Sequence, residues 1–271
     1  MSHPFLAQLV DAASQTFRPS GRFAYHYARG KLGYDTIFHE VLRRGLLPQG
    51  GPEGGRYLDL GCGQGSLFAW LLAAHRLHEQ GHWPAGWAPP PQPRQLRGVE
   101  LMQRDVDRAA RAFGPQHPVV QVEQGDMNTV DFGQPDAIVI LDALHYFSHE
   151  QQRAVLARIR QALAPGGVFL TRVGDAGAGL THRICNGVDR LVTYTRGHRL
   201  PRLYCRTLAD WVSELQRLGF VVETEPMSGR KPFANVMLVC RVPHGAKPET
   251  VSALETSRSA VFATPFLSTP T

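Results

Sequence analysis

The chain has 271 residues, 43% of them hydrophobic, so it can bury a substantial core and is not a disordered protein. Lysine and arginine outnumber aspartate and glutamate by 29 to 23, and this basic balance is compatible with an acidic partner but selects no function. The four cysteines form no CxxC pair, so neither a disulfide framework nor a four-thiolate zinc site is indicated, and we expect a cytoplasmic protein. We find neither a signal peptide nor an apolar run of the roughly 18 residues that a membrane span needs.

The first 44 residues mix aromatic and basic side chains and precede the first strand pattern. Their run of rings and cations, YHYARGK at 25–31, suits a lid over a charged ligand. We therefore expect residues 1–44 to form a helical lid or extension. An amphipathic helix packed on a sheet is the alternative.

Apolar runs alternate with helix-period segments over residues 45–243, the pattern of a sheet covered by helices on both faces. The last two runs lie too close together for a covered crossover, so they should pair antiparallel. The sequence thus predicts one α/β domain with a seven-stranded, mostly parallel sheet and an antiparallel last strand. The expected strands are 56–60, 96–100, 119–122, 137–141, 168–172, 220–223 and 235–241.

Two helices have readable starts. Ser148 with Gln151 forms a capping box before one apolar stripe, and Thr207 with Asp210 forms a similar capping pattern before another.

Three segments depart from the regular alternation of strands and helices. We expect a proline-rich surface insertion at 81–94, a substrate-side insertion at 176–206 and a disordered tail at 244–271.

The most informative stretch is LDLGCGQG at 58–65, where an apolar strand runs into glycines and then a helix. Glycines let the backbone turn tightly and approach a ligand closely, and the helix N-terminus offers N–H groups to an anionic group. Tight structural turns give the same pattern, so glycines alone decide little. Asp59 inside the strand and Ser66 at the third dinucleotide glycine position argue against an NAD-type site.

This stretch resembles the first motif of the class I S-adenosylmethionine-dependent methyltransferases, and further ordered motifs extend the resemblance over about residues 20–243. The resemblance implies a Rossmann-like fold, S-adenosyl-L-methionine as cofactor and methyl transfer as activity. It places the methionine half on the glycine backbone, Asp59 at the ammonium group, Glu100 on the ribose hydroxyls and Asp126 on the adenine amino group. The implied cofactor residues are Asp59, Gly61, Cys62, Gly63, Gly65, Glu100, Leu101, Met102, Asp126, Met127, Leu141 and Arg29.

The resemblance departs from compact nucleotide-binding units in one respect. Glu100 lies 41 positions after Asp59, whereas such units place the acid about 20 residues after their glycines. The proline-rich insertion accounts for part of the excess. The lid hypothesis gives Arg29 a further role here, binding the carboxylate of the cofactor.

Catalytic candidates follow the fourth strand, where side chains project over the carboxyl edge of the sheet. His145 is the first candidate for a general base, and Asp142 and Tyr146 accompany it. The alternative is that His145 and Tyr146 only support the loop. A sulfonium donor is already activated, so alignment and exclusion of water can suffice without a base.

Two segments are expected to contact the molecule that accepts the methyl group. Tyr25 and Tyr27 are expected at the substrate, as are Arg196 and Arg199 in an arginine-rich, partly apolar stretch. These cations suit an acidic acceptor or one bound to an acidic carrier protein, but a solvated basic helix face is an equal alternative. We therefore expect a small-molecule acceptor of aromatic, polyketide-like or lipid-like character.

Other readings are weaker. Residues 78–82, HEQGH, match a zinc motif, but Gly81 breaks the helix that the motif needs, so no metal is expected. A nucleic-acid methyltransferase is the rival within the same fold, although the fourth-strand motif of amino-directed enzymes is absent. A cofactor-binding subunit without catalysis is a further alternative. Residues 188–192 and the basic insertion weakly resemble enzymes of bacterial aryl-polyene pathways; oligomeric state cannot be read from the sequence.

Overall fold

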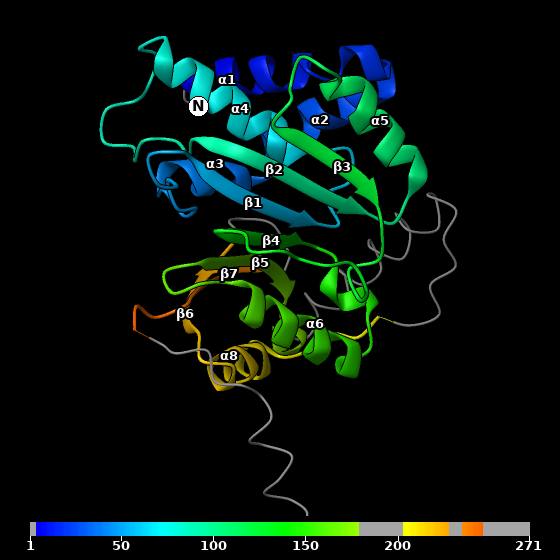
Figure 1. The fold of residues 1–271 in the computed structure, drawn as a ribbon, viewed down its shortest axis with the longest axis vertical. Coiled ribbons are helices and arrows are strands. Elements are labelled where there is room, and N and C mark those ends of the chain that lie inside the picture. The colour runs from blue at the N-terminus through cyan, green and yellow to red at the C-terminus, as the bar shows by residue number, and fades with distance from the viewer. Residues whose placement is uncertain (1–3, 179–202, 228–234, 246–271) are drawn as a thin grey trace, which may run out of the picture.

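A computed structural model describes residues 4–178, 203–227 and 235–245. Within these ranges seven strands form one sheet in the order β3-β2-β1-β4-β5-β7-β6 (Figure 1). The first five strands pair in parallel, and β7 runs antiparallel to both β5 and β6. The predicted Rossmann-like sheet with an antiparallel last strand is confirmed. The strands are β1 Gly55–Leu60, β2 Pro93–Glu100, β3 Val120–Gln124, β4 Ala137–Leu141, β5 Val168–Gly174, β6 Val221–Pro226 and β7 Asn235–Arg241.

Helices cover both faces of the sheet, as predicted (Figure 1). Alternate residues of the central strands enter two different hydrophobic cores, since successive side chains of a strand point to opposite faces. Tyr57 and Val139 join the core formed with α1–α5, whereas Leu58 and Ile140 join the core formed with α6 and α8. The helices are α1 Pro4–Gln15, α2 Arg22–Tyr34, α3 Thr36–Arg43, α4 Ser66–Glu79, α5 Gln103–Phe113, α6 His149–Ala162 and α8 Leu208–Arg217.

The N-terminal helices belong to the first core. Leu9, Phe17, Leu32 and Phe38 are all at most 1% exposed within it. The chain is also tied across by polar contacts: the indole Nε1 of Trp70 in α4 donates to the carbonyl oxygen of Phe38 at 2.8 Å. The N-terminal helices are therefore an integral part of this hydrophobic core.

Two predicted helix starts are confirmed. α6 begins with the reciprocal capping box of Ser148 and Gln151, and the Thr207 side chain caps α8 by accepting from the backbone N–H of Asp210.

The proline-rich insertion also contacts the N-terminal helix α1. Trp83 and Trp87 pack edge-on against Phe5, with ring centroids 5.2 and 5.5 Å away, so the insertion fastens α1 to the body.

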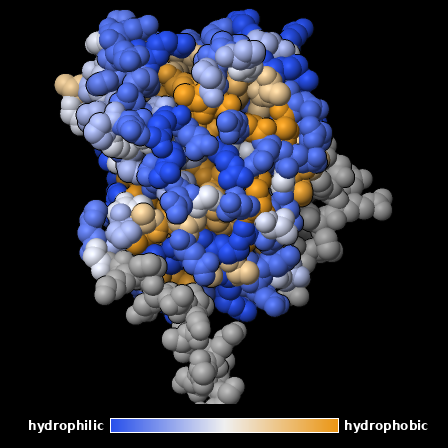
Figure 2. All heavy atoms as spheres, viewed as in Figure 1, coloured by the Kyte–Doolittle hydropathy of each residue, from blue (hydrophilic) through white to orange (hydrophobic). Residues whose placement is uncertain are grey.

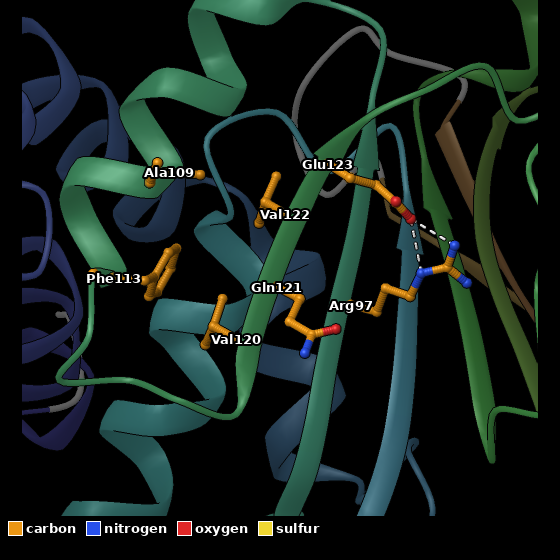
Figure 3. A pocket seen from close by; sticks show the side chains of 9 residues that line it. Arg97, Ala109, Phe113, Val120, Gln121, Val122 and Glu123 are labelled. Carbon is orange, nitrogen blue, oxygen red and sulfur yellow. Dashed lines mark hydrogen bonds and ion pairs between the residues drawn. The ribbon is translucent and has the colours of Figure 1, made fainter.

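The face in Figure 2 is mostly hydrophilic, with apolar residues visible between polar ones over the region of β3 and α5. A hollow of about 380 Å³ lies there, lined by α5, by β3 and by Arg97 of β2. Figure 3 shows Phe113, Val120 and Val122 together on one side, and the Arg97–Glu123 ion pair on the other. None of the candidate site residues lines this hollow.

No helix among the described residues has the length and apolarity to cross a bilayer.

Candidate cofactor and acceptor site

The three glycines of the turn after β1 have left-handed backbone angles. Gly61, Gly63 and Gly65 have φ values of 80°, 57° and 84°. A Cβ on Gly65 would lie 2.6 Å from the ring of Phe113, so packing requires this glycine. A Cβ on Gly63 would meet nothing within 4 Å, so this part of the backbone faces open space where a ligand can approach.

Asp59 stands at the centre of the sheet, between Gly98 of β2 and Val139 of β4, and is only 5% exposed. Burial and the negative charge of Glu100 raise its pKa to about 7, although Lys31 acts in the opposite direction. An ionised carboxylate here is costly until a cation arrives. The site is therefore complementary to a positively charged ligand group.

Glu100 ends β2 beside the glycine turn. Its Oε2 accepts from the backbone N–H of Gly63 at 2.8 Å, and its Oε1 accepts from that of Met102 at 2.9 Å. These bonds orient the carboxylate, while each oxygen keeps a second lone pair for a diol. Cys62 is buried below the turn, and burial raises the pKa of its thiol.

The residues expected around the adenine and the methyl group have distinct environments. Leu101 is 60% exposed, so its side chain is accessible to a planar ligand. Met127 is 7% exposed and belongs to the second hydrophobic core. The Oδ1 of Asp126 accepts from the backbone and side chain of Asn128, at 2.9 and 2.7 Å. Leu141 ends β4 half-buried.

A partly buried charge cluster joins the N-terminal helices to the carboxyl edge of the sheet. Arg172 of β5 donates to Asp35, at the start of α3, and to Asp142, just after β4. Lys31 of α2 lies beside them, with its Nζ 3.2 Å from Asp35 Oδ2 and 3.8 Å from Asp142 Oδ2. Residues far apart in sequence thus meet next to the glycine turn.

The cluster defines the state of Asp142. Burial opposes ionisation of this carboxyl, but Arg172 and Lys31 outweigh that effect and lower its pKa to about 2. Asp142 also is the sole non-glycine residue with positive φ, 59°, in the part of the chain described. A carboxylate so paired is a poor proton acceptor, so Asp142 is better suited to shaping the backbone beside the ligand.

The residues expected in the lid divide between two faces of α2. Arg29 pairs with Asp11 at the surface and is 45% exposed, so its guanidinium already has a partner. Tyr27 is half-buried and stacks on Phe23 at a ring separation of 6.0 Å, while Arg18 covers the ring of Tyr25. Arg29, Tyr25 and Tyr27 therefore have partners within the N-terminal region, and their predicted ligand roles stay predictions.

The loop after β4 carries His145 and Tyr146 in a short 3₁₀ turn, with ring centroids 4.2 Å apart. Gln152 of α6, fully buried, fixes this loop. Its Nε2 donates to the carbonyl oxygens of Leu144, Phe147 and Tyr204, at 2.8–3.1 Å, and Arg206 donates to its Oε1 at 2.7 Å. The sequence analysis missed Gln152.

The structure thus brings Asp59, Glu100, the glycines and Asp142 to one edge of the sheet, and adds Lys31, Asp35 and Arg172, which the sequence analysis did not select. Arg196 and Arg199 lie outside the described residues, as does most of the arginine-rich insertion and of the tail. The HEQGH segment is interrupted, since α4 ends at Glu79 and Gly81 has a φ of 76°.

These features fit a cofactor with a cationic amino-acid end, a ribose and a base. Asp59 supplies a buried acid, Gly63 an open backbone and Glu100 an oriented carboxylate. Residues 58–169 match the family described as a methyltransferase domain. Residues 58–169 are therefore identified as a methyltransferase domain, and the sheet that contains them has the class I arrangement.

Two curated proteins are similar to parts of the chain. The carboxy-S-adenosyl-L-methionine synthase of Chromohalobacter salexigens is 33% identical over 119 residues, 43% of this chain and 39% of that protein. The tetracenomycin polyketide synthesis 8-O-methyl transferase TcmO of Streptomyces glaucescens is 27% identical over 182 residues, 66% of this chain and 48% of that protein. The chain spans less than half the length of either relative.

A solved structure supports the fold. The magnesium protoporphyrin IX methyltransferase ChlM of Synechocystis PCC 6803, crystallised with bound SAH, aligns at a TM-score of 0.52 and 17% identity. The alignment covers 83% of this chain and 91% of that one. Such a likeness supports the fold alone.

Proposed function

We propose that this protein transfers the methyl group of S-adenosyl-L-methionine to a small-molecule acceptor. The observation that carries the proposal is Asp59, a buried acid whose pKa is raised to about 7 beside three left-handed glycines. A cationic amino-acid group bound there would compensate the charge that burial disfavours. The match of residues 58–169 to methyltransferase domains supports the same conclusion.

When bound, the cofactor supplies an activated methyl group on a positively charged sulfur. Asp59 would hold the ammonium group, Glu100 the ribose hydroxyls and Asp126 the adenine amino group, with Leu101 along the ring. The turn from Gly61 to Gly65 would support the methionine part. The chain contributes alignment and a site screened from water, which is what an in-line displacement chiefly requires.

His145 is the proposed general base for an acceptor that must lose a proton. It stands in the loop after β4, beside Tyr146, and the Gln152 hydrogen bonds hold that loop in place. Asp142 is not proposed as a base, because ion pairing keeps its pKa at about 2. We propose that it supports the loop instead.

For the acceptor we propose an aromatic, polyketide-like or lipid-like small molecule, free or attached to an acidic carrier protein. TcmO, an 8-O-methyl transferase of tetracenomycin polyketide synthesis, supports oxygen as the methylated atom. We place the reaction in the cytoplasm. A nucleic-acid acceptor and a catalytically silent subunit are the alternatives that the test below must separate.

The test combines binding and turnover. Calorimetry with S-adenosylhomocysteine should detect binding to the wild-type protein and a loss of about hundredfold in affinity for Glu100→Gln. Labelled methyl transfer should then appear in phenolic polyketides and not in RNA or DNA. Absence of binding by folded protein would reject the proposal, binding without turnover on any acceptor class would support the silent subunit, and label in nucleic acid would support that rival.

A further inference from the structure

Lys31 is the cation of α2 that faces the site. Its neighbours on the helix, Ala28 and Leu32, are completely buried, and its own side chain is 27% exposed. The ammonium lies beside Asp35 and Asp142 and 5.7 Å from the ring centre of Phe38. It is thus held at the carboxyl edge of the sheet.

The carboxylates around Lys31 are already neutralised by another residue. Arg172 makes two hydrogen bonds to Asp35 and two to Asp142, through Nε, Nη1 and Nη2. Lys31 makes one hydrogen bond, to Asp35 at 3.2 Å, and its 3.8 Å approach to Asp142 is too long for a second. An ammonium has three N–H donors, so Lys31 retains capacity for a further anion.

Lys31 is also electrostatically linked to Asp59. Its positive charge opposes the rise in the pKa of Asp59, so the two groups lie within interaction distance. An α-amino acid presents an ammonium and a carboxylate on the same carbon atom. A buried acid and a partly buried ammonium that interact electrostatically form a complementary pair for such a head group.

Resting on the proposed function, we propose that Lys31 binds the α-carboxylate of the cofactor, and that it makes the site selective for donors that carry this carboxylate. The N-terminal helix thereby becomes part of the cofactor site. Arg29, expected for this role from the sequence, points away and pairs with Asp11. Lys31 is a specificity-determining residue, because decarboxylated donors share the adenosine, the sulfur and the amino group.

The test measures calorimetric dissociation constants for S-adenosylhomocysteine and for its decarboxylated analogue, 5′-deoxy-5′-(3-aminopropylthio)adenosine. Wild type should prefer the carboxylated ligand by about tenfold to hundredfold. Lys31→Met should lose this preference by weakening S-adenosylhomocysteine alone, and Lys31→Arg should retain most of it. Arg22→Met, which removes an exposed cation of the same helix, is the control and should leave both affinities unchanged.

Each other outcome has a defined meaning. Equal weakening of both ligands by Lys31→Met, with an unaltered thermal unfolding profile, would overturn the proposal, because Lys31 would then act only on structure. If Arg29→Met loses the preference for the carboxylated ligand while Lys31→Met keeps it, Arg29 binds the carboxylate, and the proposal for Lys31 is overturned as well. Failure of the wild type to bind either ligand would reject the proposed function itself. If Lys31→Met does not fold, Lys31→Arg decides: loss of affinity for both ligands alike overturns the proposal.

Discussion

The guanidinium of Arg172 joins two carboxylates: its Nε donates to Asp142 Oδ1 at 2.7 Å, and its Nη1 donates to Asp35 Oδ1 at 2.5 Å. The middle of the sheet is thus joined by ion pairs to the N-terminal helices. Since Asp142 follows β4 and Asp35 begins α3, the contact fixes where the N-terminal region sits over the carboxyl edge. Several measurable properties of the protein depend on this arrangement.

Arg172→Met should lower the free energy of unfolding by about 2–3 kcal/mol at pH 7, because it leaves two carboxylates with only Lys31 as partner. The native pKa of Asp142 is about 2 against an ordinary 3.8, so its stabilising contribution is complete above pH 4 and is lost as the pH falls through 2. Denaturant unfolding of Arg172→Met, Asp142→Asn and the double variant measures this. Additive effects would contradict direct coupling.

Asp59→Asn should stabilise the ligand-free protein and weaken cofactor binding. The native pKa of Asp59 is raised to about 7, so wild type loses stability as the pH rises from about 4 to 7, and the variant does not. The gain should be near zero at pH 4 and about 4 kcal/mol at pH 8, since the shift of roughly three pKa units corresponds to about 1.4 kcal/mol per unit. Affinity for S-adenosylhomocysteine should fall about hundredfold at pH 8; a variant less stable than wild type at that pH would be inconsistent with this account.

The glycines of the turn should respond differently to alanine. Gly65→Ala places a Cβ 2.6 Å from Phe113 at a φ of 84°, so it should cost about 2–4 kcal/mol of stability. Gly63→Ala meets no atom within 4 Å, so its backbone strain should cost only about 1 kcal/mol. Gly63→Ala should nevertheless weaken ligand binding, since its side chain enters the open space. Thermal unfolding and calorimetry on both variants test the contrast.

Gln152→Leu should lower stability by about 2–4 kcal/mol, since three carbonyl oxygens and the Arg206 guanidinium lose a buried partner. The same change at Gln161, on the exposed face of α6, is the control and should stay within about 0.5 kcal/mol. Chemical denaturation compares them. Similar small effects for both would mean that the loop after β4 is held by other contacts.

His145→Gln should reduce methyl transfer about a hundredfold or more, as removal of a general base does, while affinity for S-adenosylhomocysteine stays within twofold. His149→Gln, on the adjoining exposed turn, is the matched control with normal turnover. Initial rates on the acceptor identified by the labelling screen are the measurement. Full activity of His145→Gln would leave alignment alone as the catalytic contribution.

The strands were predictable because β4 is apolar throughout and because β1 and β5 each contain clustered apolar residues, which is typical of strands covered on both faces. The charge cluster was not, because Asp35 and Arg172 lie 137 residues apart and only the tertiary fold brings them together. One signal was available: an arginine in an otherwise apolar strand needs an acidic partner if it is buried.

The choice between Arg29 and Lys31 had a readable signal as well. Ala24, Ala28 and Leu32 form the buried stripe of α2. With 3.6 residues per turn, Lys31 lies about 60° from the centre of that stripe and Arg29 about 100° from it. Helical periodicity therefore favoured Lys31 as the residue that faces the sheet. The alternation of aromatic and basic residues at 25–31 had instead suggested Arg29.

The packing of the N-terminal helices decides how this chain can be recombined with similar proteins. Gln64, inside the glycine turn, donates to the carbonyl oxygen of Ala24, and Trp70 donates to that of Phe38. Both donors lie beyond residue 45, and both acceptors lie before it. A chimaera that exchanges only residues 1–44 would replace the residues that cover Trp70 and the Phe5 ring that packs on Trp83 and Trp87. An exchange that continues through the turn, α4 and the proline-rich insertion keeps all these partners together, so the crossover point falls after Trp87.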